Sequence, residues 1–171
     1  MFTLRFSPIE IPYWAGRYPI ETDYEVETVI APRVQERGYY TGSELAKVCY
    51  WKTPRSKKLI AANSEDSVSN ITRFSLSTSD ERQRIEGLLM LIGVGWPTAT
   101  VLLHFGFLNL YPIHDYRALW SLGIDESEKL HRFSFWQEYT IYCRWLASEV
   151  GVSLRTLDRA LWQYSKENQP K

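Results

Sequence analysis

The stretch LIGVGWPTATVLLHF, residues 91–105, decides the fold that we predict for this chain. Glycines at 93 and 95 flank one valine, a proline follows at 97, and an apolar helical pattern begins at once. An apolar stripe at helical spacing also precedes the turn, formed by Ile85, Leu88, Leu89 and Ile92. Because glycine reaches backbone angles that are closed to other residues, the pattern predicts two helices joined by a tight turn.

A helix that begins directly behind such a turn is a candidate anion site. Its first backbone N–H groups have no partner within the helix, and the helix dipole also attracts negative charge. A DNA phosphate fits that geometry, so we predict that the DNA backbone is contacted by Gly93, Val94, Gly95, Trp96 and Thr98. Carbonyl oxygens on the other side of the turn are a candidate site for a monovalent cation. An ordinary corner between two helices is the alternative interpretation.

The composition sets limits on the class of protein. The 171 residues suit one domain, and a 44% hydrophobic content supports a substantial core. Twenty basic residues balance twenty acidic ones, so no global field attracts nucleic acid, although one local patch can still do so. Two cysteines, Cys49 and Cys143, are too few for an iron–sulfur cluster or a four-cysteine zinc site, and no metal site formed by side chains is predicted.

The cysteine usage also bears on the expected compartment. Reduced thiols indicate an intracellular protein, and neither a signal peptide nor a membrane-spanning run is evident. We therefore expect a cytoplasmic protein without a membrane partner, associated with the nucleoid if it binds DNA. The sequence does not determine its oligomeric state.

Along the rest of the chain the patterns predict an all-α fold. We expect one compact multi-helix domain over residues 1–171, with an extended arm at 1–20, a helical body at 43–167 and the hairpin at 93–97. Pro32 is expected to bend or divide an acidic helix at 21–37. The other predicted helices are 43–51 capped by Ser43, 54–63, 64–76, one begun by a capping box of Thr78 and Glu81, a short one from Asp115, 134–149, and 153–166 capped by Ser153.

Residues 93–123, GVGWPTATVLLHFGFLNLYPIHDYRALWSLG, carry a further set of markers. They are Gly93-Val94-Gly95, Thr98-Ala99, Gly106, Pro112 and Asp115. In this order and spacing the set resembles the helix-hairpin-helix/Gly-Pro-Asp superfamily of DNA glycosylases, of which the chain would be a short member. The resemblance is strong over about 85–123, and elsewhere only the helical character matches. It implies double-stranded DNA, including damaged DNA, as the partner.

The resemblance also implies roles for single residues. Asp115 would line the pocket that receives a base swung out of the duplex, where a carboxylate stabilises the positive charge that builds on the sugar. Its alternative role is the N-cap of the following helix. Family members that also cut the strand carry a lysine where Pro97 stands, so we expect water as the nucleophile and no lyase activity.

Two groups of neighbouring residues complete the candidate site. His114 and Arg117 flank Asp115, and Arg117 has three open roles: pairing with Asp115, holding a phosphate, or packing the surface. The segment KVCYWKTPRSKK, 47–58, is basic and free of acids. We expect phosphate contacts from Lys52, Arg55 and Lys57, and a base-pocket wall from Tyr50 or Trp51. A solvated helix face with both rings turned inward is the alternative.

The preferred hypothesis is a monofunctional DNA glycosylase-like protein that excises a base at Asp115. A non-catalytic DNA binder that uses the same hairpin is the first alternative. A helical protein-interaction module, in which the hairpin is only a corner, is the second. Beyond the monovalent cation, no cofactor is expected.

Overall fold

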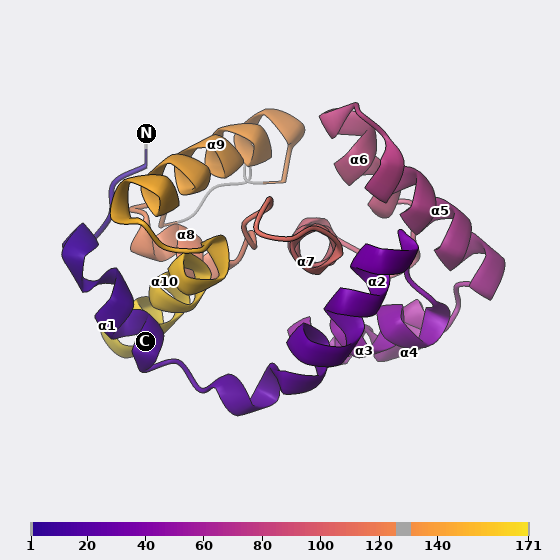
Figure 1. Ribbon diagram of the computed structural model, residues 1–171, viewed down its shortest axis with the longest axis horizontal. Coiled ribbons are helices and arrows are strands. Elements are labelled where there is room, and N and C mark those ends of the chain that lie inside the picture. The colour runs from indigo at the N-terminus through magenta and orange to yellow at the C-terminus, as the bar shows by residue number, and fades with distance from the viewer. Residues whose placement is uncertain (1, 126–130, 171) are drawn as a thin grey trace. The chain divides into compact units, whose positions relative to one another are not determined.

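The computed structural model describes residues 2–125 and 131–170, and all regular elements within these ranges are helices (Figure 1). The predicted all-α class is therefore confirmed. The chain divides into two compact units, and each is described by itself. Unit 1 comprises Met1–Pro19 and Asn109–Lys171, and unit 2 comprises Ile20–Leu108. Whether the two units form the single domain predicted over 1–171 is not tested by this division, so the single domain stays a prediction.

Unit 2 is built around one buried helix, α7, which is seen nearly end-on in Figure 1. Each residue of α7 from Thr98 to Gly106 is buried, as its almost continuous apolar sequence predicts. The helix packs against η3, α2, α3 and α6. In chain order, unit 2 contains η2 (Ile20–Thr22), η3 (Val26–Ile30), α2 (Ala31–Arg37), α3 (Gly42–Lys52), η4 (Pro54–Ser56), α4 (Lys57–Ile60), α5 (Glu65–Ser77), α6 (Glu81–Leu88) and α7 (Trp96–Gly106).

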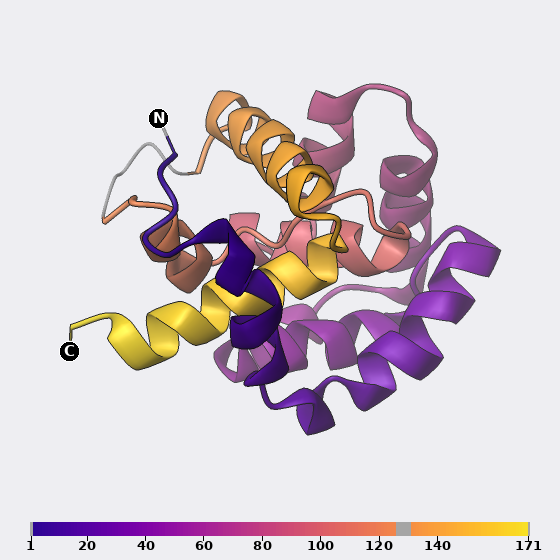
Figure 2. The same cartoon turned by 60° about the vertical axis from the view of Figure 1, so that its left-hand side comes forward.

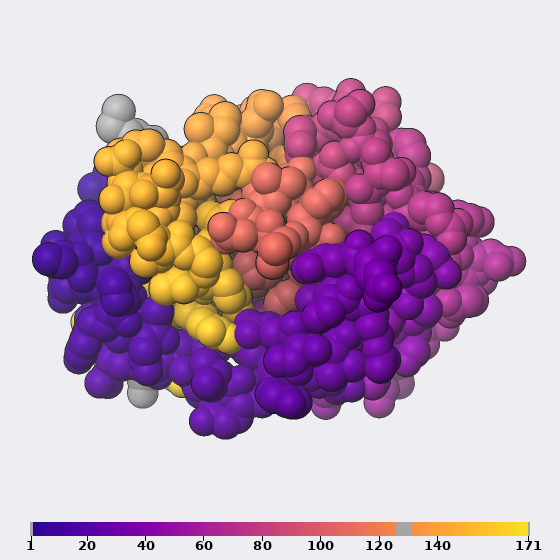
Figure 3. Space-filling view, viewed as in Figure 1, coloured from indigo at the N-terminus to yellow at the C-terminus, as the bar shows by residue number. Residues whose placement is uncertain are grey.

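A wider helical turn precedes Pro32, where the sequence predicts a bend or a division. A π-helical turn, η3, directly precedes α2, which carries Pro32 in its first turn, and the Ala31 amide donates to the Val26 carbonyl. Proline lacks an amide hydrogen and its ring crowds the preceding turn, so a wider turn at this point accommodates it within a continuous helical segment. Residues 20–37 lie along the surface of unit 2 in the space-filling view (Figure 3).

Two helix starts differ from the prediction. Helix α3 is capped by Thr41 rather than Ser43, because Thr41 forms a reciprocal capping box with Glu44. Helix α6 is capped by Asp80 rather than Thr78, since Asp80 Oδ1 accepts a hydrogen bond from the Gln83 amide at 2.9 Å. In both cases a nearby hydroxyl or carboxylate with the same capping chemistry lies two residues away from the predicted one.

Unit 1 contains η1 (Pro8–Glu10), α1 (Ile11–Gly16), α8 (Tyr116–Ser121), α9 (Phe133–Val150) and α10 (Leu154–Asn168). Its core joins one face of each of these α-helices, with Ile11, Leu119, Cys143 and Leu157 among its buried members. The last two predicted helices are confirmed, and so are the residues predicted to end the first and to cap the second. Gly151 ends α9 in the left-handed conformation, and Ser153 caps α10.

The predicted extended arm over 1–20 is wrong in its second half. Residues 2–7 belong to no helix or strand, and the Thr3 and Arg5 amides donate to the Leu122 and Ser121 carbonyls at 2.9 Å. Residues 8–16 are instead helical, and α1 lies against α10 (Figure 2). Pro8 and Pro12 occupy first-turn positions, where no amide hydrogen is needed, and the burial of Ile11 holds this short helix in place.

Candidate nucleic-acid interface

The predicted short glycine turn joins α6 to α7 within unit 2. Gly93 has a φ of +83°, and the Val94 amide donates to the Leu91 carbonyl at 3.1 Å. Gly95 is the N-cap of α7, with extended backbone angles of −101° and 180°. A chain reversal over so few residues needs the left-handed conformation at Gly93, which glycine adopts without steric cost.

Helix α4 and Asn63 hold this turn from one side. A Cβ atom on Gly93 would lie 2.8 Å from Leu59 Cβ and 3.2 Å from the Ile60 nitrogen. Asn63 bridges the two segments, because its Nδ2 donates to the carbonyls of Ile60 and Ile92 and its Oδ1 accepts from the Ile92 amide. The turn is therefore fixed by backbone contact and a side-chain clamp, which predicts a single conformation.

Replacement of Gly93 by alanine is expected to destabilise unit 2. The change forces a non-glycine residue into left-handed angles and places its Cβ against Leu59, so we expect a loss of about 2–3 kcal/mol in the free energy of unfolding. Urea unfolding followed by circular dichroism measures it. Gly16→Ala is the matched control, because no heavy atom lies within 4 Å of the added Cβ. An equal effect of both changes would contradict this account.

The Val94 amide is not available to a phosphate, although Val94 was among the residues predicted to contact the DNA backbone. Val94 is buried, and its N–H donates to the Leu91 carbonyl inside the turn. The prediction that this N–H faces outward is therefore wrong. The first helical hydrogen bond of α7 runs from the Ala99 amide to the Gly95 carbonyl at 2.8 Å. Within residues 2–125 and 131–170, the amides of Gly95, Trp96 and Thr98 donate no hydrogen bond to the protein. Gly95 is also exposed, with only Pro97 Cδ within 4.0 Å of an added Cβ.

The basic segment predicted to contact phosphates lies beside this turn. Lys57 and Lys58 directly precede Leu59 and Ile60, the two residues that pack against Gly93. Arg55, Lys57 and Lys58 are exposed, and Lys52 is half-buried. The fold of unit 2 thus places α4, which carries Lys57 and Lys58, against the turn at Gly93.

The two aromatic residues of the segment have different environments. Trp51 packs inside unit 2, where its Nε1 donates to Asp23 Oδ1 at 3.1 Å and its ring lies edge-on to Phe105. Trp51 is half-buried and turned toward these two residues, as the inward alternative describes, and its role in a pocket wall stays a prediction. Tyr50 is 53% exposed, with Lys57 Nζ 5.8 Å from its ring centroid. Of the two, Tyr50 is the ring that solvent or a ligand reaches.

Asp115 lies in unit 1 and caps α8, as the alternative interpretation predicts. Its Oδ1 accepts a hydrogen bond from the Arg117 amide at 2.8 Å, and its carbonyl accepts from the Leu119 amide. The residue is 8% exposed. The cap fixes the carboxylate orientation, and the catalytic role implied by the resemblance stays a prediction.

The neighbours of Asp115 have separate surroundings. His114 is 1% exposed and packs between the rings of Phe135 and Tyr139, at centroid distances of 5.7 and 5.5 Å. Burial raises the pKa of Tyr139 well above its ordinary value, and its hydroxyl donates to the Ile113 carbonyl. Arg117 places its guanidinium over the rings of Tyr116 and Trp162. His114 thus belongs to the core, whereas Arg117 belongs to a surface cluster.

The two cysteines and His104 are buried. Burial raises the pKa of the Cys49 thiol to about 12 and also raises that of Cys143, so both thiols stay protonated at neutral pH. His104 is a buried residue of α7. No group of three or more His, Cys, Asp or Glu side chains in the described part of the chain is placed to bind a metal ion.

The monovalent cation expected at the turn stays a prediction. The carbonyls of Leu91, Ile92 and Gly95 each accept a hydrogen bond from within unit 2. A carbonyl oxygen has a second lone pair, so these oxygens are compatible with a bound cation. The helices that the structure describes are too short or too polar for any of them to cross a bilayer.

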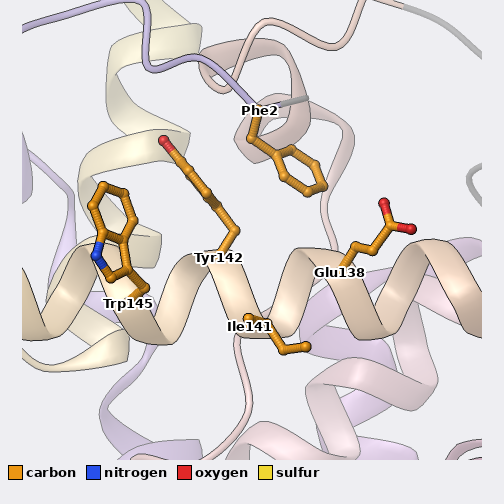
Figure 4. A pocket seen from close by; sticks show the side chains of 5 residues that line it. All are labelled: Phe2, Glu138, Ile141, Tyr142 and Trp145. Carbon is orange, nitrogen blue, oxygen red and sulfur yellow. The ribbon is translucent and has the colours of Figure 1, made fainter.

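An apolar hollow of about 370 Å³ lies on the outer face of α9 in unit 1 (Figure 4). Its lining comes from one helical stripe, Glu138, Ile141, Tyr142 and Trp145, together with Phe2. This hollow is not among the sites predicted from the sequence. Residues three and four apart share a helix face, so the stripe itself is visible in the sequence, whereas the contribution of Phe2 depends on tertiary folding.

Comparison of the chain with protein-family models, curated proteins and solved structures gave no match. The functional argument therefore depends on the residues of the chain itself.

Proposed function

We propose that this protein binds double-stranded DNA through the turn at 93–97 and the exposed cations of residues 55–58. One observation carries the proposal. Leu59 and Ile60 pack directly against Gly93, so exposed Arg55 and Lys57 belong to the same local structure as the Gly95 and Trp96 amides. Cations and unpaired helix N-terminal donors in one place favour a phosphate.

Such a surface binds duplex DNA although the chain has equal numbers of acidic and basic residues. Phosphates are contacted locally, within about 8 Å at physiological salt, because ions screen more distant charges. Backbone amides and lysines read no base sequence, so the expected binding is weakly sequence-dependent and strongly salt-dependent.

We further propose that the protein excises a base at Asp115, with water as the nucleophile. The supporting observation is the environment of the carboxylate, which is nearly buried and held in one orientation by the Arg117 amide. In a partly desolvated site, a fixed negative charge stabilises a developing oxocarbenium ion more strongly than it would in water. Proline at position 97 supplies no amine for a Schiff base, which supports hydrolysis without strand cleavage.

The double change Arg55→Gln with Lys57→Gln is expected to weaken duplex binding. Each lost phosphate contact lowers the slope of log affinity against log salt by about 0.9, so the slope should fall by about 2. Fluorescence anisotropy of a labelled duplex between 50 and 200 mM salt, roughly the range over which such contacts are resolved, measures the change. The measurement uses the full chain.

Arg33→Gln with Arg132→Gln is the matched control, because both arginines are exposed and the change in net charge is the same. An equal fall of the slope in this control would reduce the effect to overall charge. If the wild-type chain does not bind duplex DNA, both DNA proposals are wrong and the protein-interaction module remains.

A further inference from the structure

A second cluster of cationic and aromatic side chains lies in unit 1, on α8 and α10. Its centre is Trp162, a half-buried residue of α10. The Arg117 guanidinium carbon lies 5.4 Å from the centroid of the Trp162 ring, and Lys166 Nζ lies 5.0 Å from it. Arg117 also lies 5.1 Å from the ring centroid of Tyr116. Two cations of different helices thus share one indole.

More cations follow along the same face of α10. Arg155 and Arg159 lie over the ring of Tyr18, at 5.4 and 5.6 Å from its centroid. That ring in turn meets Trp162 edge-on at 5.2 Å. The positions 155, 159, 162 and 166 are separated by three or four residues, which places them on one side of the helix.

Two carboxylates of α10 already have cationic partners. Asp158 forms an ion pair with Arg155, and Glu167 forms one with Arg17 while also accepting from Gln163. Among residues 2–125 and 131–170, neither Arg117 nor Lys166 is in an ion pair. The cluster therefore carries an excess of positive charge.

The rings explain how two cations are accommodated at one indole. The face of an aromatic ring attracts a cation, and a stacked guanidinium keeps its N–H donors at the rim of its plane. Those donors, and the three of the lysine ammonium, remain available to an oxyanion. A bound phosphate would also remove the mutual repulsion of Arg117 and Lys166.

We propose that Arg117 and Lys166, positioned by Trp162, form a phosphate-binding site, and that its ligand is a phosphodiester of nucleic acid. The identification of nucleic acid rests on the proposed function, whereas the anion site itself does not. Arg117 follows Asp115 by two residues, so this site and the proposed catalytic carboxylate are neighbours in the chain.

The test compares the full-length wild type with the double variant Arg117→Gln/Lys166→Gln. Anisotropy with a labelled duplex across a salt series is the first arm, and the expected result is a salt slope lower by about 2 and a 10- to 100-fold weaker affinity at low salt. Titration of inorganic phosphate, observed at the indole N–H signal of Trp162 by NMR, is the second arm. The control is again Arg33→Gln/Arg132→Gln, and Trp162→Phe should retain part of the binding because a ring remains.

The outcomes separate the two proposals. If the wild type binds duplex DNA and the double variant binds with the same slope, the phosphate site is wrong and the proposed function stands. If the wild type does not bind DNA but phosphate shifts the Trp162 signal in the wild type and not in the variant, the anion site stands and its ligand is a free phosphate. If neither arm responds, both proposals fail. Circular dichroism of each variant distinguishes loss of binding from loss of the α8–α10 packing.

Discussion

Replacement of Gly95 by aspartate is expected to abolish most duplex binding while the protein stays folded. Gly95 is the N-cap of α7, has extended backbone angles and has open space around it, so the larger residue fits without strain. Aspartate is a preferred N-cap, and its carboxylate would accept from the Thr98 amide and stabilise α7 by a few tenths of a kcal/mol, roughly the usual gain over glycine. The same carboxylate would occupy the place of a phosphate and repel it, weakening binding by about 100-fold or more.

The Gly95→Asp change is expected to raise or keep the stability of the protein while it lowers the affinity for DNA. Thermal unfolding should show a melting temperature equal to or above that of the wild type, while anisotropy shows the loss of affinity. Gly95→Asn is the matched control, because asparagine caps the helix similarly but carries no charge. It should weaken binding by no more than about 10-fold, the cost of engaging one donor. Unchanged binding in both variants would mean that the α7 N-terminus contacts no phosphate.

Most helices of this chain were predictable from local patterns, whereas the helix at 8–16 depends on tertiary contacts. The α9 and α10 boundaries follow from Gly151 and Ser153, whose backbone and side-chain chemistry act within a few residues. The helix at 8–16 was missed because its stability comes from the burial of Ile11 against distant residues. Prolines at its start indicated an extended chain, yet proline is equally suited to a first helical turn.

Some features of the candidate site were also predictable from local sequence, and others depend on tertiary contacts. The turn at 93–95 was predictable because glycine is the residue that adopts left-handed angles without strain. A Cβ atom at position 93 would also lie only 2.8 Å from Leu59 Cβ. The Asn63 clamp was not, since the sequence shows only a residue that often ends helices, 29 positions from its partner Ile92. The Arg117–Trp162–Lys166 cluster was also missed, because Arg117 comes from a different helix. Spacing within α10 shows a basic and aromatic face, but it cannot show which ring a distant arginine meets.

Replacement of Asp115 by asparagine is expected to abolish base release without unfolding unit 1. Asparagine is as good an N-cap as aspartate, so the hydrogen bond from the Arg117 amide to the side-chain oxygen is retained. What disappears is the negative charge that stabilises the oxocarbenium ion, and removing such an electrostatic contribution lowers the rate by roughly 100-fold or more. The substrate panel consists of duplexes with alkylated, oxidised and deaminated bases, followed by heating in alkali to cleave abasic sites.

The cap gives this test its control. Asp115→Ala removes both the charge and the cap, so it should lose base release and also about 1 kcal/mol of stability, whereas Asp115→Asn should lose base release alone. If the wild type releases no base from any duplex in the panel, Asp115 is only a helix cap and the protein is a non-catalytic binder. If the wild type and Asp115→Asn release base at equal rates, the reaction occurs elsewhere in the chain. Only a rate that follows the charge, at constant stability, assigns the reaction to this carboxylate.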